Sequence, residues 1–157
     1  MINGREKLHI DFDGSRVGNV SIFEIAQWAV QNQLAPVSVT PINSTTGVTL
    51  TAAQLTSAQN ITLIRNAGPA AAFTDTTDTA ANIAKAIPAL AKAPGGFAYP
   101  IRIRIVNNTT QTQTIAGGTG VTVSGTATLA TLTYRDFILQ QTSATAFTLT
   151  DVGSGTN

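Results

Sequence analysis

His9, Asp11 and Asp13 are the residues of this chain whose types and spacing come closest to those of a metal site. In an alternating strand the three side chains share one face, where an imidazole and two carboxylates can bind zinc. The solvated face of an ordinary strand carries the same kinds of residue, so the pattern is open to both interpretations. We therefore assign no metal ligand.

Other chemical motifs are incomplete. Asp75 and Asp78, in TDTTDT, offer two carboxylates, but acid-base catalysis needs them in unlike environments within a cleft, and helix capping explains them more simply. His9 is the only histidine and there is no cysteine, which leaves little material for a catalytic triad. The segment GGTG lacks the lysine of a phosphate-binding loop. We predict no enzyme activity, no catalytic residue and no cofactor.

Three arginines form the remaining candidate site. Arg102 and Arg104 alternate with isoleucines in IRIRIV, which places both on one face of a strand, and we consider Arg135 as a third member of that face. Such a group can pair with Asp136 or Asp151 of another chain, or bind an anionic ligand. Both alternatives remain open at this point.

Composition narrows the classes of partner. Charged residues make up 11% of the 157 residues, less than half of the usual ~25%, and hydrophobic residues make up 43%. A surface built from Thr, Ser, Asn and Gln can be covered by a protein partner without burying ions. The net charge of +1 argues against nucleic acid, and no apolar run is long enough to cross a membrane. Charges stand where a signal peptide would be apolar, so we expect synthesis in the cytoplasm.

The first forty residues hold seven of the seventeen charged residues and differ from the rest. Lys7 to Phe12 alternates as an amphipathic strand, and Ser21 with Glu24 forms a capping box that predicts a helix over Ile22 to Gln31. That helix is apolar nearly all round, so it is either a core helix or a contact between copies of the chain. Its candidate interface residues are Ile22, Phe23, Ile25 and Trp28.

The remainder reads mainly as strands. The segment from Gln33 to Gln59, with its prolines, predicts one or two edge strands, and a short helix carrying Ile83 and Ile87 is expected after a cap at Asp75, Thr76 or Asp78. Further strands are expected at 60–68, 99–106, 111–116, 121–129, 131–140 and 144–151, with IAGGTGVTV as a hairpin. The predicted fold class is mainly β, an antiparallel β-sandwich or barrel with two short helices. We divide the chain into an N-terminal strand, helix and connector, residues 1–45, and a Thr- and Gly-rich β domain, residues 46–157.

One pattern extends from Leu50 to Thr156 and comprises AGPAAAFTDTTDTAANIAKAIP, the NNTT turn, the Gly-rich turn, and TYRDFIL before TAFTLTDVGSG. This pattern resembles small structural proteins of tailed bacteriophages, among them head decoration (cement) proteins and fibre-like proteins. The resemblance implies a virion protein on the capsid surface that forms a homo-oligomer, expected to be a trimer, and binds the major capsid protein. Phe23, Trp28, Ile22, Ile25, Arg102 and Arg104 are then the expected interface residues. The alternative is a tail-fibre or lectin-like module that binds a host glycan through Phe97, Tyr99 or Phe73.

Overall fold

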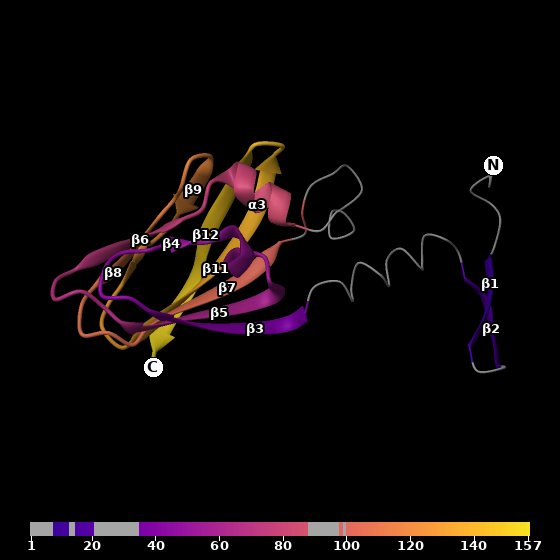
Figure 1. Ribbon diagram of the computed structural model, residues 1–157, viewed down its shortest axis with the longest axis horizontal. Helices are drawn as coiled ribbons and strands as arrows, with labels where there is room; N and C mark the ends of the chain where they lie inside the picture. Colours follow the sequence, from indigo (N-terminus) through magenta and orange to yellow (C-terminus); the bar gives the residue numbers. More distant parts are fainter. Residues whose placement is uncertain (1–7, 13–14, 21–34, 88–97, 99) are drawn as a thin grey trace.

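The computed structural model describes residues 8–12, 15–20, 35–87, 98 and 100–157 (Figure 1). The strands and helices of these residues are β1 (Leu8–Phe12), β2 (Ser15–Val20), β3 (Ala35–Asn43), β4 (Thr49–Leu50), α2 (Ala52–Leu55), β5 (Ala58–Ala67), β6 (Phe73–Thr77), α3 (Ala80–Ala86), β7 (Ile101–Asn107), β8 (Gln113–Ala116), β9 (Val121–Ser124), β10 (Thr128–Leu129), β11 (Thr133–Ser143) and β12 (Ala146–Thr156).

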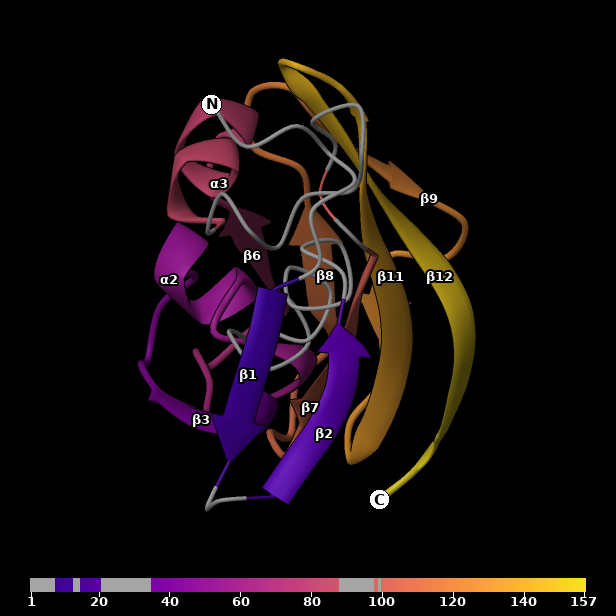
Figure 2. The ribbon, with the colours of Figure 1, turned by 90° about the vertical axis from the view of Figure 1, so that its right-hand side faces the viewer.

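Two sheets enclose the core. The larger has six strands in the order β3-β5-β7-β11-β12-β9, and the smaller has four in the order β10-β8-β6-β4. Figure 2 shows β6 and β8 to one side and β11 and β12 to the other. Alternate residues of each strand point into the space between the sheets, which is why the apolar positions have a period of two. The fully buried side chains include Leu50, Leu63, Ile83, Ile103, Ile115, Leu129, Phe137 and Phe147.

The predicted mainly-β sandwich with two short helices is confirmed, but the strand directions are mixed. β3, β5 and β7 run parallel to one another, whereas β7, β11 and β12 are antiparallel. β9 runs parallel to β12, and the smaller sheet is also mainly parallel. Parallel neighbours need a long crossover, and here β6 and α3 separate β5 from β7 in the chain. Alternation of apolar residues indicates a strand but not its direction, so the sequence could not predict this.

The connector residues form edge strands, as predicted. β3 is the outermost strand of the larger sheet, and β4 is the outermost strand of the smaller one. Pro36 and Pro41 lie on β3, where the free edge tolerates residues that lack a backbone donor. Because β3 pairs with β5 over most of its length, it belongs to the sandwich, although the predicted division after residue 45 groups it with the N-terminal part.

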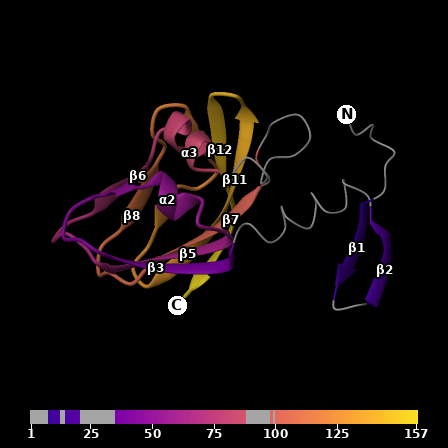
Figure 3. The same cartoon turned by 45° about the vertical axis from the view of Figure 1, so that its right-hand side comes forward.

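The two helices of the structure are only partly those expected. α3 matches the predicted helix, but its N-cap is Thr79, whose hydroxyl accepts from the backbone N–H of Asn82, so the three proposed cap positions are wrong. α2 was not predicted, and it is capped by a reciprocal pair of hydrogen bonds between Thr51 and Gln54. Figure 3 shows the two helices side by side. The helix predicted at Ile22–Gln31 lies outside the described residues.

The glycine-rich segment is a crossover and not the hairpin that we predicted. β8 belongs to the smaller sheet, whereas β9 pairs with β12 in the larger one. Gly120 has φ of 79°, and a Cβ there would lie 2.7 Å from the carbonyl oxygen of Thr145, so only glycine fits this passage. Turn residues show where a chain changes direction, but they do not reveal which strand it joins next.

Within the described residues, the N-terminal strands β1 and β2 pair only with each other, as an antiparallel hairpin. No helix among the described residues of the whole chain is long and apolar enough to cross a membrane.

Candidate binding surface

The outer face of the larger sheet carries the two arginines singled out from the sequence. Ile101, Ile103 and Ile105 of β7 are buried in the core, which turns Arg102 and Arg104 outward as the alternation predicted. Across the sheet, the register places Arg104 between Thr62 of β5 and Asp136 of β11. Together Arg102, Arg104 and Asp136 form what we call the outer cluster.

Arg104 donates two hydrogen bonds to Asp136, one from each of two guanidinium nitrogens. Nε donates to Oδ1 and Nη2 to Oδ2, each at 2.8 Å, and the guanidinium carbon lies 4.1 Å from the ring centre of Tyr134. The hydrogen bonds from Arg104 hold the pKa of Asp136 below its ordinary value, and the same bonds raise the pKa of Arg104. In a bidentate pair of this kind, each oxygen of the carboxylate accepts one hydrogen bond from the guanidinium. The charge of Asp136 is therefore balanced by Arg104.

Arg102 makes a weaker contact with the same carboxylate. Its Nη2 lies 3.6 Å from Oδ2 of Asp136, which is too long for a directed hydrogen bond. Its side chain is 59% exposed, compared with 43% for Arg104 and 10% for Asp136. The outer cluster thus has two positive charges and one negative charge. Of its three side chains, that of Arg102 is the most exposed.

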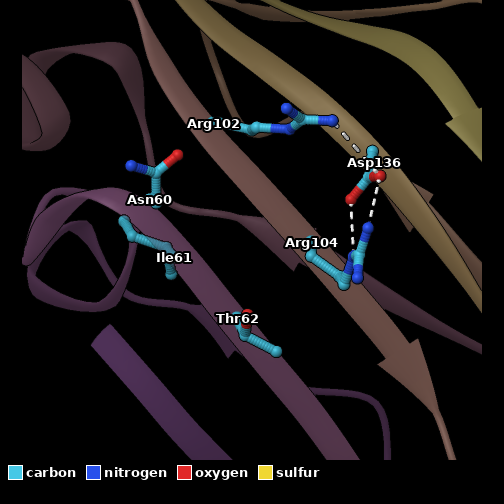
Figure 4. A pocket seen from close by; sticks show the side chains of 6 residues that line it. All are labelled: Asn60, Ile61, Thr62, Arg102, Arg104 and Asp136. Atoms are coloured by element: carbon cyan, nitrogen blue, oxygen red, sulfur yellow. Dashed lines mark hydrogen bonds and ion pairs between the residues drawn. The ribbon is translucent and has the colours of Figure 1, made fainter. Parts of the chain in front are cut away.

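A shallow depression of about 200 Å³ lies beside the outer cluster, between β5 and β7. It is lined by Asn60, Ile61 and Thr62 together with the three charged residues, and Figure 4 shows the arginines reaching away from β5 toward Asp136. The outward row continues onto β3 at Val37 and Val39, which are 62% and 59% exposed. The depression therefore combines amide, hydroxyl and guanidinium groups next to a strip of exposed aliphatic surface.

Arg135 does not join this face, which corrects the expectation that the three arginines gather together. In the register it stands opposite Ile105, an inward residue, and its Nη1 donates to Oδ2 of Asp151 at 2.7 Å. Its Nε donates to the carbonyl of Thr128 on β10, so it links the two sheets. Partial burial raises the pKa of Asp151, but the hydrogen bonds from Arg135 and Gly153 outweigh it and leave that pKa below its ordinary value. The aspartates expected to pair between chains are thus already paired within one chain.

A third arginine and aspartate pair was missed in the sequence and lies wholly inside the sandwich. Nε of Arg65 on β5 is 3.2 Å from Oδ2 of Asp75 on β6, and both side chains have zero exposure. Asp75 also accepts hydrogen bonds from Nε2 of Gln113 and from the backbone N–H of Val48, while Arg65 donates to the carbonyl of Thr46. We call Arg65 and Asp75 the inner pair. The signal for Arg65 was its inward position after Ile61 and Leu63.

Asp75 and Asp78 therefore take part in separate hydrogen-bond networks. Asp78 accepts from the side-chain amide of Asn82 and from the backbone N–H groups of Ala52 and Thr79, and these bonds lower its pKa. It thereby ties the start of α2 to the start of α3.

Other predicted site residues are placed as follows. Phe73 is 7% exposed and its ring lies 4.9 Å from the guanidinium of Arg65, so it is a core residue and not a glycan platform. His9 and Asp11 lie on β1. Among the described residues, no three His, Cys, Asp or Glu side chains are grouped closely enough to hold a metal. The expected residues that fall outside the described ones are Asp13, Ile22, Phe23, Ile25, Trp28, Phe97 and Tyr99.

No protein-family model, curated protein or solved structure is significantly similar to this chain. The function must therefore be argued from the surface itself. What that surface offers is an open sheet face on which two arginines share one aspartate.

Proposed function

We propose that this protein is a structural, non-catalytic component of a phage particle, a head decoration protein that forms a homo-oligomer and binds the capsid through the outer face of β3, β5 and β7. The resemblance to phage structural proteins noted in the sequence suggests the setting. The main structural support is the exposed strip of Val37 and Val39 on an uncharged edge strand.

An edge strand gives affinity without special side chains. Its unpaired backbone groups can bond to a strand of a partner, and its outward side chains then add apolar contact. Soluble proteins usually protect such an edge with lysines or other charges, but β3 has none and carries only prolines as protection. A strand of this composition, next to a face with a single charged cluster, suits attachment to another protein.

Immunoelectron microscopy of virus particles that contain the chain tests the proposal directly. An antibody against the folded sandwich should place gold on the head surface. Labelling of tail fibres would contradict it and favour the glycan-binding alternative. The absence of the chain from purified particles would remove both virion roles.

The contact surface can be tested by substitution. Val37→Lys combined with Val39→Lys adds two charges to β3 that must lose water in a covered interface, so the occupancy of the heads should fall about tenfold or more at fixed protein concentration. Val152→Lys is the matched control, because Val152 is 49% exposed on β12, at a distance from β3 in the strand order. Equal occupancy for both variants would exclude β3 as the contact.

Sedimentation equilibrium of the full chain tests the oligomer. We expect a trimer in solution or, if assembly needs the shell, a monomer that becomes trimeric clusters on particles. A stable dimer would contradict the proposed subunit number.

A further inference from the structure

We propose that the depression beside the outer cluster is a carboxylate-binding site, and that it receives an aspartate or glutamate side chain of the partner protein on which the outer face docks. This inference deepens the proposed function and rests on it for the nature of the partner. The site consists of the guanidinium of Arg102, with Asn60 and Thr62 on the opposite wall.

The charge balance of the outer cluster selects an anion. Both oxygens of Asp136 receive hydrogen bonds from Arg104, so the carboxylate has little left to offer the second arginine. Arg102 is held near it by charge alone, at 3.6 Å, with more than half of its side chain in solvent. A guanidinium has five N–H donors in a planar fork, which matches the two oxygens of a carboxylate. Arg102 is therefore the group in this cluster that can accept a new partner.

The neighbouring residues favour a group presented by a protein surface. Thr62 contributes a hydroxyl to the wall opposite the arginines, and it is the neighbour of Val39 in the register. A partner that covers Val39 would thus bring its own side chains over the depression. The ring of Tyr134 already packs against the guanidinium of Arg104, at 4.1 Å. A sugar ring would find no second aromatic platform among the described residues that line the depression.

The same charge balance argues against two copies of this face meeting each other. A symmetric pair would bring two clusters together, each with an excess positive charge, and like charges that are brought into an interface cost binding energy. Each copy would also need an acidic side chain opposite Arg102, but among the described residues that line the depression the only acidic one is Asp136, which Arg104 already binds. The face is therefore complementary to a different protein and not to itself, which separates shell attachment from oligomer formation.

Nuclear magnetic resonance titration of the isolated full-length chain tests the site without any capsid. The probe is aspartate blocked at both termini, and the neutral comparison is blocked asparagine, at constant ionic strength. The Nε–Hε signal of Arg102 should move and saturate with blocked aspartate but not with blocked asparagine. The signals of Arg65, which is fully buried, and of Arg135, which is bonded to Asp151, should stay in place.

Substitutions at Arg102 and at Lys85 test whether the binding measured in the titration depends on Arg102. Arg102→Gln should weaken binding by about tenfold or more, and Arg102→Lys, which keeps the charge but not the fork, should give an intermediate loss. Lys85→Gln removes a charge from the last turn of α3, outside the residues that line the depression, and should change nothing. If blocked aspartate and blocked asparagine act alike, or if Lys85→Gln weakens binding as much as Arg102→Gln, the site does not exist.

A third probe separates the source of the carboxylate. Glucuronate presents the same group on a sugar ring, and binding about tenfold tighter than that of blocked aspartate would overturn the protein assignment in favour of an acidic glycan. Because these titrations use the isolated chain, a negative result would leave virion labelling unaffected. Equally, an absence of label on particles would not alter the titration.

Discussion

Arg65 with Asp75 and Arg104 with Asp136 are chemically the same pair in two different surroundings. The inner pair has no exposure to solvent and lies between the two sheets, whereas the outer cluster lies on the open face of one sheet. The geometry is better at the surface, where both carboxylate oxygens receive short hydrogen bonds. Inside, Nε of Arg65 is close to Asp75 but does not make a directed hydrogen bond, and Nη1 has no partner among the described residues.

Because one pair is buried and the other is at the surface, the two pairs contribute differently to the stability of the protein. Burying two charges costs more than their attraction returns unless the geometry is very good, so the inner pair is not an efficient source of stability. It does join β5 of one sheet to β6 of the other through two buried charges, and either charge would be destabilising without the other. We infer that it fixes how the sheets face each other. In the outer cluster the two arginines are exposed to solvent while Asp136 is not, so water can still solvate the positive charges.

Removing one member of the inner pair should have the largest effect on stability. Asp75→Asn leaves the charge of Arg65 buried without compensation, so we expect the free energy of unfolding to fall by about 3–5 kcal/mol. Urea denaturation followed by circular dichroism measures this. A loss of less than about 1 kcal/mol would mean that solvent reaches Arg65, contrary to the burial described here.

A double substitution tests whether that loss comes from the stranded charge. Arg65→Met combined with Asp75→Leu replaces both charges with apolar groups, and we expect it to recover most of the stability lost in Asp75→Asn. If the double variant is as unstable as the single one, the hydrogen bonds from Gln113 and Val48 to Asp75 carry the stability instead.

The equivalent change in the outer cluster should be much milder. Asp136→Asn removes the partner of Arg104, but that side chain is 43% exposed and water can replace the lost bonds. We expect a loss of about 1 kcal/mol or less in the same urea experiment. A loss as large as that of Asp75→Asn would show that the outer cluster is a structural pair as well.

The smallest expected effect is the dependence of stability on pH. The folded-state pKa of Asp136 is lowered, so its contribution is fully present above the unfolded value of about 4 and is lost as the pH falls through the folded value. Wild-type protein should therefore lose slightly more stability than Asp136→Asn between about pH 5 and pH 2. Parallel urea midpoints for the two proteins measure this, and identical slopes would mean that the pair does not form in solution.

Local patterns predicted the elements of the fold better than their connections. Alternation located β7 and the outward direction of Arg102 and Arg104, and prolines located the edge strand β3, because both signals act within a few residues. Strand order and direction depend on contacts between distant segments, which no local pattern records. That is why the Gly-rich segment has the local pattern of a hairpin, with Gly120 at the positive φ expected of a turn, and yet connects two sheets.

The candidate site was predicted only in part for a similar reason. Sequence placed Arg102 and Arg104 together, but the selection of Asp136 as their partner follows from the register of β7 with β11. Asp75 was assigned to a helix cap because it precedes α3, while its place in β6, two residues after the buried Phe73, indicates an inward side chain. An acidic residue at an inward position is the signal that was available and not used.

The strand order of the larger sheet also governs how fast the chain folds. β5 and β7 pair along their length although a strand, a helix and the segment after it separate them in the chain, and β9 joins β12 across β10 and β11. Pairing of distant segments is slow, because loop closure must come before the contacts that stabilise it. Until β5 pairs with β7, the pair formed by β3 and β5 has two free edges. One is the outer edge of β3, which carries no charge, and the other is the edge of β5, and both can pair with strands of other chains. Refolding yield should therefore fall as protein concentration rises, and dilute, slow refolding should recover more of the native protein.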